Sequence, residues 1–335
     1  MKRLLFLLAL IPFVAWGQKA LIYGGKVVTE SGKVVTYSAY CAEYQAVYDD
    51  YTTKPDAATA VIYNHMVEQL VAAGLWSTQW DIVRGYGMTT NAAGEALINW
   101  INPALYGATA YNAPTFTALQ GFTFDGATQY NSQNWIPSSD GVKYTQNSAS
   151  WVIYIRTNIA SVGVTVGHGV YSSATLKDLF LNPRRSNNLA YVRINSKDTE
   201  TGSNTNGSGL YVLTRTSSST QKLYRNAVLI VDGSATTSSG APTITPFTGA
   251  YNDDGTPLGF RADEVFFEAF GALMTQEQVT TLNAIIEEAA DALGVGVQSP
   301  TMIVFILIIL IYAGNRKKFD EAPDYYINST FKRAA

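Results

Sequence analysis

Two glutamates near the end of a long apolar segment have the spacing that best fits catalysis. Glu264 and Glu268 stand four positions apart in a run that includes Val265, Phe266 and Phe267. Side chains four apart in a β-strand point to the same face of a sheet. Two carboxyl groups on one face are the arrangement that glycosidases use. A carbohydrate-active enzyme, glycosidase or lyase, is therefore the alternative to our main expectation, which is a chain that is not an enzyme.

Other catalytic or metal-binding patterns are lacking in the sequence. The only histidines, His65 and His168, and the only cysteine, Cys41, have no metal-ligand spacing among them. The sequence has no phosphate-binding loop, dinucleotide fingerprint or serine nucleophile elbow. We expect no cofactor, and we expect His65 and His168 to have structural or loop roles.

Sugar binding would use exposed aromatic rings flanked by amide and hydroxyl groups. Two groups of residues in the sequence fit that description, although a place in the core or in a turn is the commoner explanation for each residue. The candidate ligand-binding residues are Trp135, Tyr130 and Asn134 in one segment, and Tyr251 and Asn252 in another.

The composition favours an exported β protein. Charged residues make up 15% of the 335 residues, and the net charge of −3 argues against a nucleic-acid partner. The 21 tyrosines and 6 tryptophans are typical of strands and of glycan-facing surfaces. A single cysteine allows no intramolecular disulfide, so the fold depends on core burial.

Apolar segments at both ends predict export and anchoring. Residues 1–17 have the pattern of a signal peptide, with Lys2 and Arg3 before an apolar stretch and small residues before the cleavage point. Residues 294–314 are predicted to be a transmembrane helix, followed by a basic cytoplasmic tail at 315–335. The alternative for the apolar run Met302–Ile311 is a buried strand, because isoleucine favours strands.

Between these ends the sequence predicts three parts. Residues 18–40 read as a β-hairpin and residues 41–118 as a helical module with a linker, containing a helix at 52–74. Residues 119–293 alternate short apolar runs with turn residues and end in an amphipathic helix capped by Thr275 and Gln278. We expect a mainly β fold, an antiparallel β-sandwich, with strands at 119–124, 149–157, 162–170, 177–182, 188–195, 209–216, 220–225, 227–232, 244–251 and 259–270.

Three short segments resemble the concanavalin A-like, laminin-G-type jelly roll. Lys222–Val228 looks like a hairpin of that fold, with Ala227 in place of the usual turn glycine. Gly249–Asn252 looks like a strand end, and Ala262–Glu277 is similar to the closing strand and the start of a terminal helix. This resemblance implies a jelly roll over 119–293. Glycosidases on this fold place an aspartate between their two glutamates, where this chain has Phe266.

The same resemblance implies what the loops could bind. Jelly rolls of this type often hold a structural calcium ion, for which Asp253 and Asp254 are the candidate ligands, with turn formation as the other explanation.

Residues 52–150 also resemble phage or prophage surface proteins that join a helical module to a jelly roll. We therefore expect an exported, membrane-anchored binding or structural protein, such as a virion adhesin, with a glycan or cell-surface ligand and a possible homo-oligomeric state. A non-catalytic host cell-surface protein is the other alternative.

Overall fold

The computed structural model describes residues 20–23, 26–29, 34–36, 40–163 and 166–298. The first three of these ranges form an antiparallel sheet of strands β1 (Ala20–Tyr23), β2 (Lys26–Thr29) and β3 (Val34–Thr36). The hairpin predicted for residues 18–40 thus has a third strand. The rest of the description concerns residues 40–298.

An eight-stranded sheet forms the centre of the molecule. Its strand order is β16-β15-β14-β9-β20-β7-β6, with β4 also paired to β20. All of its pairings are antiparallel, and β9 and β20 lie in the middle. The strands are β4 (Trp80–Gly85), β6 (Thr115–Thr117), β7 (Gly121–Thr123), β9 (Ala149–Ile155), β14 (Gly209–Arg215), β15 (Gln221–Arg225), β16 (Val228–Gly233) and β20 (Glu264–Gly271).

A second layer contains a six-stranded and a three-stranded sheet. Their orders are β13-β12-β11-β10-β18-β19 and β17-β8-β5, and all pairings are antiparallel except β10 with β18. The strands are β5 (Thr109–Tyr111), β8 (Tyr130–Ser132), β10 (His168–Val170), β11 (Asp178–Asn182), β12 (Leu189–Ser196), β13 (Glu200–Ser203), β17 (Phe247–Thr248), β18 (Tyr251–Asp253) and β19 (Thr256–Leu258). The prediction of a mainly β fold with antiparallel sheets in two layers is confirmed. The predicted strands at 162–170 and 259–270 are shorter than expected, and the strand predicted at 244–251 is divided between β17 and the first residue of β18.

Buried side chains join the two layers. Within the eight-stranded sheet, the buried rings of Trp151 on β9 and Phe270 on β20 stack with centroids 5.7 Å apart. From the second layer, the Thr248 hydroxyl on β17 donates to Glu268 on β20 at 2.7 Å. Arg215 of β14 donates a hydrogen bond of 2.6 Å to the carbonyl of Ile194 on β12. The space between the sheets therefore contains polar groups as well as a close-packed apolar core.

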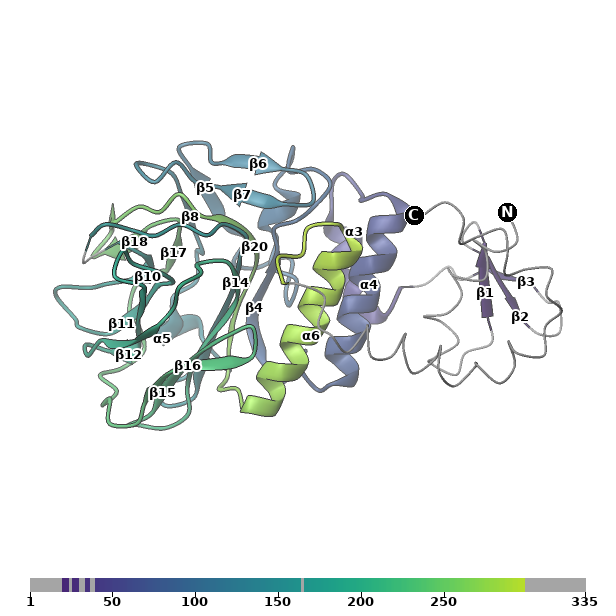
Figure 1. Ribbon diagram of the computed structural model, residues 1–335. Helices are drawn as coiled ribbons and strands as arrows, with labels where there is room; N and C mark the ends of the chain where they lie inside the picture. Colours follow the sequence, from purple (N-terminus) through teal and green to yellow (C-terminus); the bar gives the residue numbers. More distant parts are fainter. Residues whose placement is uncertain (1–19, 24–25, 30–33, 37–39, 164–165, 299–335) are drawn as a thin grey trace, which may run out of the picture. The chain divides into compact units, whose positions relative to one another are not determined.

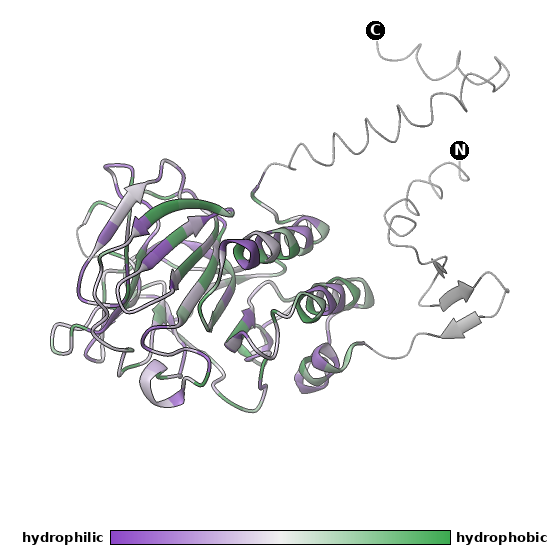
Figure 2. Ribbon diagram, turned by 90° about the horizontal axis from the view of Figure 1, so that it is seen from below, coloured by the Kyte–Doolittle hydropathy of each residue, from purple (hydrophilic) through white to green (hydrophobic). Residues whose placement is uncertain are grey.

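Two helices cover the other face of the eight-stranded sheet (Figure 1). Helix α4 (Ala57–Ala72) contacts helix α6 (Gln276–Ala292), and Gln69 of α4 donates a hydrogen bond to Glu288 of α6 at 2.9 Å. The Tyr154 hydroxyl on β9 donates to Glu287 at 2.6 Å. Helix α6 carries hydrophilic residues on its outer side and buries apolar residues such as Leu282 and Ile286, as expected for a helix that lies on a sheet, whereas α4 is apolar on more of its surface and exposes Val61 and Val71 (Figure 2).

The helix ends follow from local sequence. Thr275 and Gln278 form the predicted capping box at the start of α6, and Gly294 has a positive φ of 74° after its end. The helix predicted at 52–74 is α4, which begins at Ala57, after the N-cap residue Asp56, whose side chain accepts from the Thr59 N–H at 2.9 Å. A shorter helix, α3 (Ala42–Asp50), precedes α4, and one-turn helices occur at η1 (Glu95–Leu97) and α5 (Pro137–Asp140).

The predicted helical module at 41–118 is only partly helical. Residues 80–85 form β4, which pairs with β20 along the centre of the sandwich. All residues of this strand except Asp81 are buried, so both of its faces are covered. The β body therefore begins well before residue 119.

No helix among the residues between 20 and 298 that the structure describes is long and apolar enough to cross a membrane. The predicted signal peptide at 1–17 and most of the predicted transmembrane segment at 294–314, with the tail after it, lie outside the described residues.

Candidate functional site

An exposed tyrosine lies over a buried tyrosine at the edge of the three-stranded sheet. Tyr111 on the edge strand β5 is 42% exposed, and its ring stacks on that of Tyr130 on β8, with centroids 4.7 Å apart and planes 4° apart. Tyr130 is buried against Phe247, with centroids 4.5 Å apart. Burial is the main cause that raises the pKa of Tyr130, and the electrostatic effect of the neighbouring Tyr111 raises it further. The stack fixes the plane of an exposed ring.

Polar side chains with fixed orientations occur in the chain segments next to Tyr111 and Tyr130. Thr109 shares a face of β5 with Tyr111, and its hydroxyl accepts a hydrogen bond of 2.8 Å from the Asn134 amide. The Asn112 amide donates to the Thr128 carbonyl at 2.7 Å, and the Gln129 amide donates to the Ala113 carbonyl at 3.1 Å. We call Thr109, Tyr111, Asn112, Gln129 and Asn134 the Tyr111 platform. The amide nitrogens are anchored, so their side chains are already oriented at this surface.

The chemistry of the platform suits a sugar. One face of a pyranose ring is rich in C–H groups and can lie on an aromatic ring, while the hydroxyls around it need hydrogen-bond partners. A tyrosine ring held by stacking loses little freedom when a ligand covers it. Carbonyl oxygens of amides and hydroxyl groups supply the acceptors.

The buried polar network beneath the platform fixes the segments that carry it. Arg84 is fully buried, and its guanidinium donates to the carbonyls of Leu97 at 2.7 Å, of Gln133 at 2.9 Å, and of Tyr106. The carbonyls of Leu97 and Tyr106 precede β5, and that of Gln133 precedes Asn134. The arginine on the central strand β4 therefore holds both chain segments that lead to the platform.

The sequence-predicted sugar-binding residues have different places. Trp135 is fully buried against Tyr144 and Phe270, so the expectation that it is an exposed ring is wrong. Tyr130 is the buried member of the stack, and Asn134 is exposed beside it.

Tyr251 and Asn252 lie elsewhere on the second layer and are also buried. Tyr251 packs against Tyr171 and Phe180, and the Asn252 side chain donates to the Thr245 carbonyl at 2.8 Å and accepts from the Gly255 N–H at 2.7 Å. The structure thus brings Tyr130 and Asn134 together at one surface and does not bring Tyr251 and Asn252 to it.

The aspartates predicted to bind calcium are engaged in a loop. Asp253 accepts from the Ser173 N–H at 3.1 Å, and Asp254 accepts from the Ser172 hydroxyl at 2.7 Å and the Ala174 N–H at 3.2 Å. Calcium takes six to eight oxygen ligands. In the described part of the chain no group of three or more histidine, cysteine, aspartate or glutamate side chains has the geometry to hold a metal ion. The two carboxylates hold the segment at 172–174, and calcium binding by Asp253 and Asp254 stays a prediction.

Glu264 and Glu268 do not share a face, contrary to the sequence-based expectation. A β-bulge between Val265 and Phe267 shifts the register against β9 and reverses the alternation. Glu264 pairs with Arg156 at 2.8 Å, whereas Glu268 is fully buried between the sheets and accepts from Trp151 at 2.8 Å and from Tyr86, Gln133 and Thr248 at 2.7 Å each. The two carboxyl groups therefore form no catalytic pair.

His168 also differs from the expected loop role. It is fully buried on β10, where its Nδ1 accepts from the Gly249 N–H at 2.9 Å and its Nε2 lies 2.9 Å from an oxygen of Asp263. Burial lowers the pKa of His168 in spite of Asp263. A neutral ring that donates from Nε2 satisfies both contacts.

Comparisons with known proteins give limited likenesses. No protein-family model matches the sequence, and a search of curated proteins gives no match. Domain 4 of the extracellular GH43 arabinanase AbnA from Geobacillus stearothermophilus is similar at 17% identity and a TM-score of 0.35, over 52% of this chain and 81% of that one. A Trypanosoma rangeli sialidase mutant with trans-sialidase activity is similar at 13% identity and a TM-score of 0.47, over 72% of this chain and 39% of that one. At these values the likenesses transfer no activity to this chain.

The expectation that the chain is not an enzyme is nevertheless corrected. The similar solved chains include a domain of an arabinanase and sialidases, which are enzymes that act on carbohydrates. We therefore withdraw the exclusion of catalysis that rested on the sequence alone.

Sequence reasoning missed Tyr111, the exposed ring of the platform. The available signal was the alternation of Thr109, Ala110 and Tyr111, which places Thr109 and Tyr111 on one side of a short strand. Its contact with Tyr130 depends on pairing between strands that are distant in sequence and could not be read from local pattern.

Proposed function

We propose that this chain is a carbohydrate-binding protein that contacts a glycan at the Tyr111 platform. The observation that carries the proposal is the parallel stack of Tyr111 on Tyr130, with one ring buried and the other 42% exposed among oriented amides and a hydroxyl. The resemblance of the sequence to concanavalin A-like, laminin-G-type jelly rolls supports the same function. The proposal does not depend on the distant likenesses to solved glycosidases.

A glycan array of the full-length chain tests this proposal. Tyr111→Ala is expected to weaken binding to the best glycan about tenfold, because the variant loses the stacking surface. Tyr111→Phe should bind like the unchanged chain, since the ring and its stack remain. Tyr48→Ala on α3 is the control, because it removes a half-exposed tyrosine from a helix instead of the platform.

Two results would contradict the proposal. One is an array on which the unchanged chain binds no glycan. The other is equal glycan affinity for Tyr111→Ala and the unchanged chain at equal stability. Incubating each bound glycan with the chain and measuring new reducing ends shows whether binding is accompanied by cleavage.

The more specific form of the proposal is an exported, membrane-anchored adhesin, such as a phage or prophage virion protein. It rests on the signal-peptide pattern at 1–17, the apolar run Met302–Ile311 with the basic residues after it, and the sequence resemblance of residues 52–150. An outward-facing body on a membrane would place a glycan-binding surface where cell-surface glycans occur.

Cell fractionation tests the anchoring part. The full-length chain is expected in the membrane fraction and to resist extraction by high salt, whereas a chain that ends at Gln298 should appear in the soluble fraction. Recovery of the full-length chain in the soluble fraction without detergent would count against the anchor. It would leave the glycan-binding proposal in place.

A further inference from the structure

One arginine in the turn between β11 and β12 has a guanidinium group without a hydrogen-bond partner among the described residues. The Arg185 guanidinium carbon lies 4.3 Å from the centroid of the Tyr191 ring on β12. Its Nε is buried and has no hydrogen-bond partner, and within the described residues of 40–298 its side chain forms no ion pair. The buried Nε is out of a ligand's reach, so the terminal nitrogens of this half-buried side chain are the donors that a ligand could meet.

The other arginines of the described chain differ from Arg185. Each donates at least one side-chain hydrogen bond to a carbonyl, an amide or a carboxylate. The adjacent Arg184 is bound by Asn158 at 2.8 Å and by Asn188 at 2.9 Å. Arg215 also has one buried nitrogen without a partner, Nη2, but among the described arginines only Arg185 makes no side-chain hydrogen bond at all, and its loop neighbour Arg184 shows that this is not a property of the loop.

The position of Arg185 is fixed before any ligand binds. Its backbone N–H donates to the Leu189 carbonyl at 2.9 Å, and its carbonyl accepts from the Asn188 N–H at 2.8 Å, which closes a tight turn. Stacking on Tyr191 orients the plane of the guanidinium. The Tyr191 hydroxyl accepts from the Asn187 amide at 2.9 Å, which leaves its own O–H as a donor.

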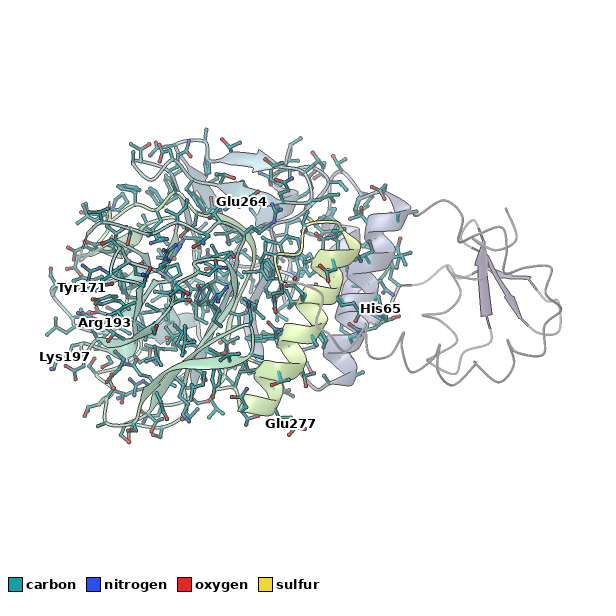
Figure 3. All side chains as sticks on the ribbon, in the orientation of Figure 1. His65, Tyr171, Arg193, Lys197, Glu264 and Glu277 are labelled. Atoms are coloured by element: carbon teal, nitrogen blue, oxygen red, sulfur yellow. The ribbon has the colours of Figure 1, made fainter. Side chains whose placement is uncertain are left out.

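A second cation lies on the same face of β12. Tyr191 and Arg193 are two positions apart and half-buried, whereas Ala190, Val192 and Ile194 between and beside them are buried, so both side chains point outward. The Arg193 guanidinium carbon is 4.4 Å from the centroid of the Tyr171 ring, and Arg193 also pairs with Asp178. Figure 3 shows Tyr171 and Arg193 on the side of the molecule away from His65 and the helices.

We propose that Arg185 and Tyr191, with Arg193 beside them, bind an oxyanion group, carboxylate or sulfate, of an acidic saccharide. The planar guanidinium group matches the two oxygens of such a group, and its N–H groups make no hydrogen bonds to the described residues. Thr201 and Ser203, the residues paired across from Tyr191 and Leu189 on β13, supply uncharged polar groups. The saccharide class rests on the proposed glycan-binding function, and the oxyanion site rests on Arg185.

Titration of the full-length chain with three oligosaccharides of equal length tests this inference. The probes are a polyuronate, a sulfated glycan and a neutral glycan, and inorganic sulfate is the competitor. Arg185→Gln is expected to weaken binding of at least one acidic probe about tenfold and to reduce the salt dependence of its affinity, while affinity for the neutral probe stays unchanged. Comparison of the two acidic probes identifies the group that the site prefers.

Matched variants separate charge from shape. Arg185→Lys keeps the charge and loses the planar fork, so it should restore only part of the affinity. Lys197→Gln removes an exposed cation that is paired with Asp198 at 2.7 Å, and it should leave affinity for both acidic probes unchanged.

The outcomes distinguish this inference from the proposed function. Binding of the neutral probe with no binding of either acidic probe would overturn the oxyanion site and keep glycan binding. An equal loss for acidic and neutral probes in Arg185→Gln would also overturn it. Equal Arg185-dependent binding of an acidic peptide would overturn the assignment to a saccharide, and failure of every probe would contradict both proposals.

Discussion

Replacing Arg84 by methionine is expected to lower the free energy of unfolding by about 3–5 kcal/mol. Arg84 on β4 is paired across the sheet with Glu268 on β20, and both are fully buried. Gln133 connects the two charges, since it accepts from Arg84 Nε at 2.6 Å and donates to a Glu268 oxygen at 2.7 Å. Burial raises the pKa of the Glu268 carboxyl group and the nearby Arg84 opposes that shift, so without the arginine the buried carboxyl group keeps its hydrogen bonds and loses the cation that favours its charged form. Urea unfolding followed by circular dichroism measures the change.

Two further variants show whether the loss comes from the buried charge. Arg84→Met with Glu268→Gln removes both charges, and it should recover part of the stability that the single variant loses. Lys222→Met breaks the pair of Lys222 with Asp232, whose partner atoms lie 3.7 Å apart at the surface, and should cost at most about 1 kcal/mol. A loss below about 1 kcal/mol for Arg84→Met would show that the buried pair is not needed.

This prediction also concerns the candidate site. The same guanidinium holds the carbonyls of Leu97, Tyr106 and Gln133, which precede the strand of Tyr111 and the side chain of Asn134. The variant should therefore bind glycan more weakly even under conditions in which it is fully folded. Tyr111 would then depend on a residue in the core for its orientation.

Replacing Asp263 by asparagine is expected to cost about 3–5 kcal/mol of stability near neutral pH. Asp263 is buried between His168 and Arg261, and Arg261 also donates to Asn182 at 2.9 Å. Burial opposes the charge of Asp263, but the Arg261 guanidinium and the His168 hydrogen bond outweigh it and hold the pKa of Asp263 below its usual range. The neutral asparagine leaves the guanidinium of Arg261 without a counter-charge.

The pH dependence of this loss has a definite sign. A carboxyl group whose pKa is lower in the folded than in the unfolded chain stabilises the fold above its unfolded pKa of about 3.9, and this contribution is lost as pH falls. The stability difference between the unchanged chain and Asp263→Asn should therefore be largest between about pH 6 and 8 and should narrow below about pH 4. Urea unfolding at several pH values measures it.

The control for this prediction is a carboxylate at the surface. Asp232→Asn changes a half-exposed carboxylate, and its effect should stay within about 1 kcal/mol at every pH. A difference between the unchanged chain and Asp263→Asn that stays the same from about pH 7 to about pH 3 would contradict the account of the buried cluster.

Regular local patterns predicted much of the fold. The capping box of Thr275 and Gln278 and the apolar face behind it are properties of one short segment, so helix α6 could be recognised directly. Strands such as β14 and β15 were equally clear, because turn residues separate them. The segment at 80–85 was misread because a strand covered on both faces lacks the alternation that marks a strand with one exposed face.

The candidate site was less accessible to sequence reasoning. A single β-bulge near Val265 places Glu264 and Glu268 on opposite faces of the strand. The order of apolar and polar residues in the sequence does not reveal where this bulge lies. Tyr130 and Asn134 were recognised by residue type, but which ring faces solvent depends on the pairing of β5 with β8. Arg185 was missed because an arginine without a partner is visible only when its surroundings are known.

Hydrogen exchange with and without the best-binding glycan tests the central claim most directly. Strand β5 is an edge strand, so amides of residues 109–113 can exchange with solvent and report a ligand that covers Tyr111. We expect slower exchange in residues 109–113 and 128–134 when glycan is bound, with no change in α6. Glycan-dependent protection confined to other segments, with β5 unaffected, would contradict the assignment of the sugar site to the Tyr111 platform.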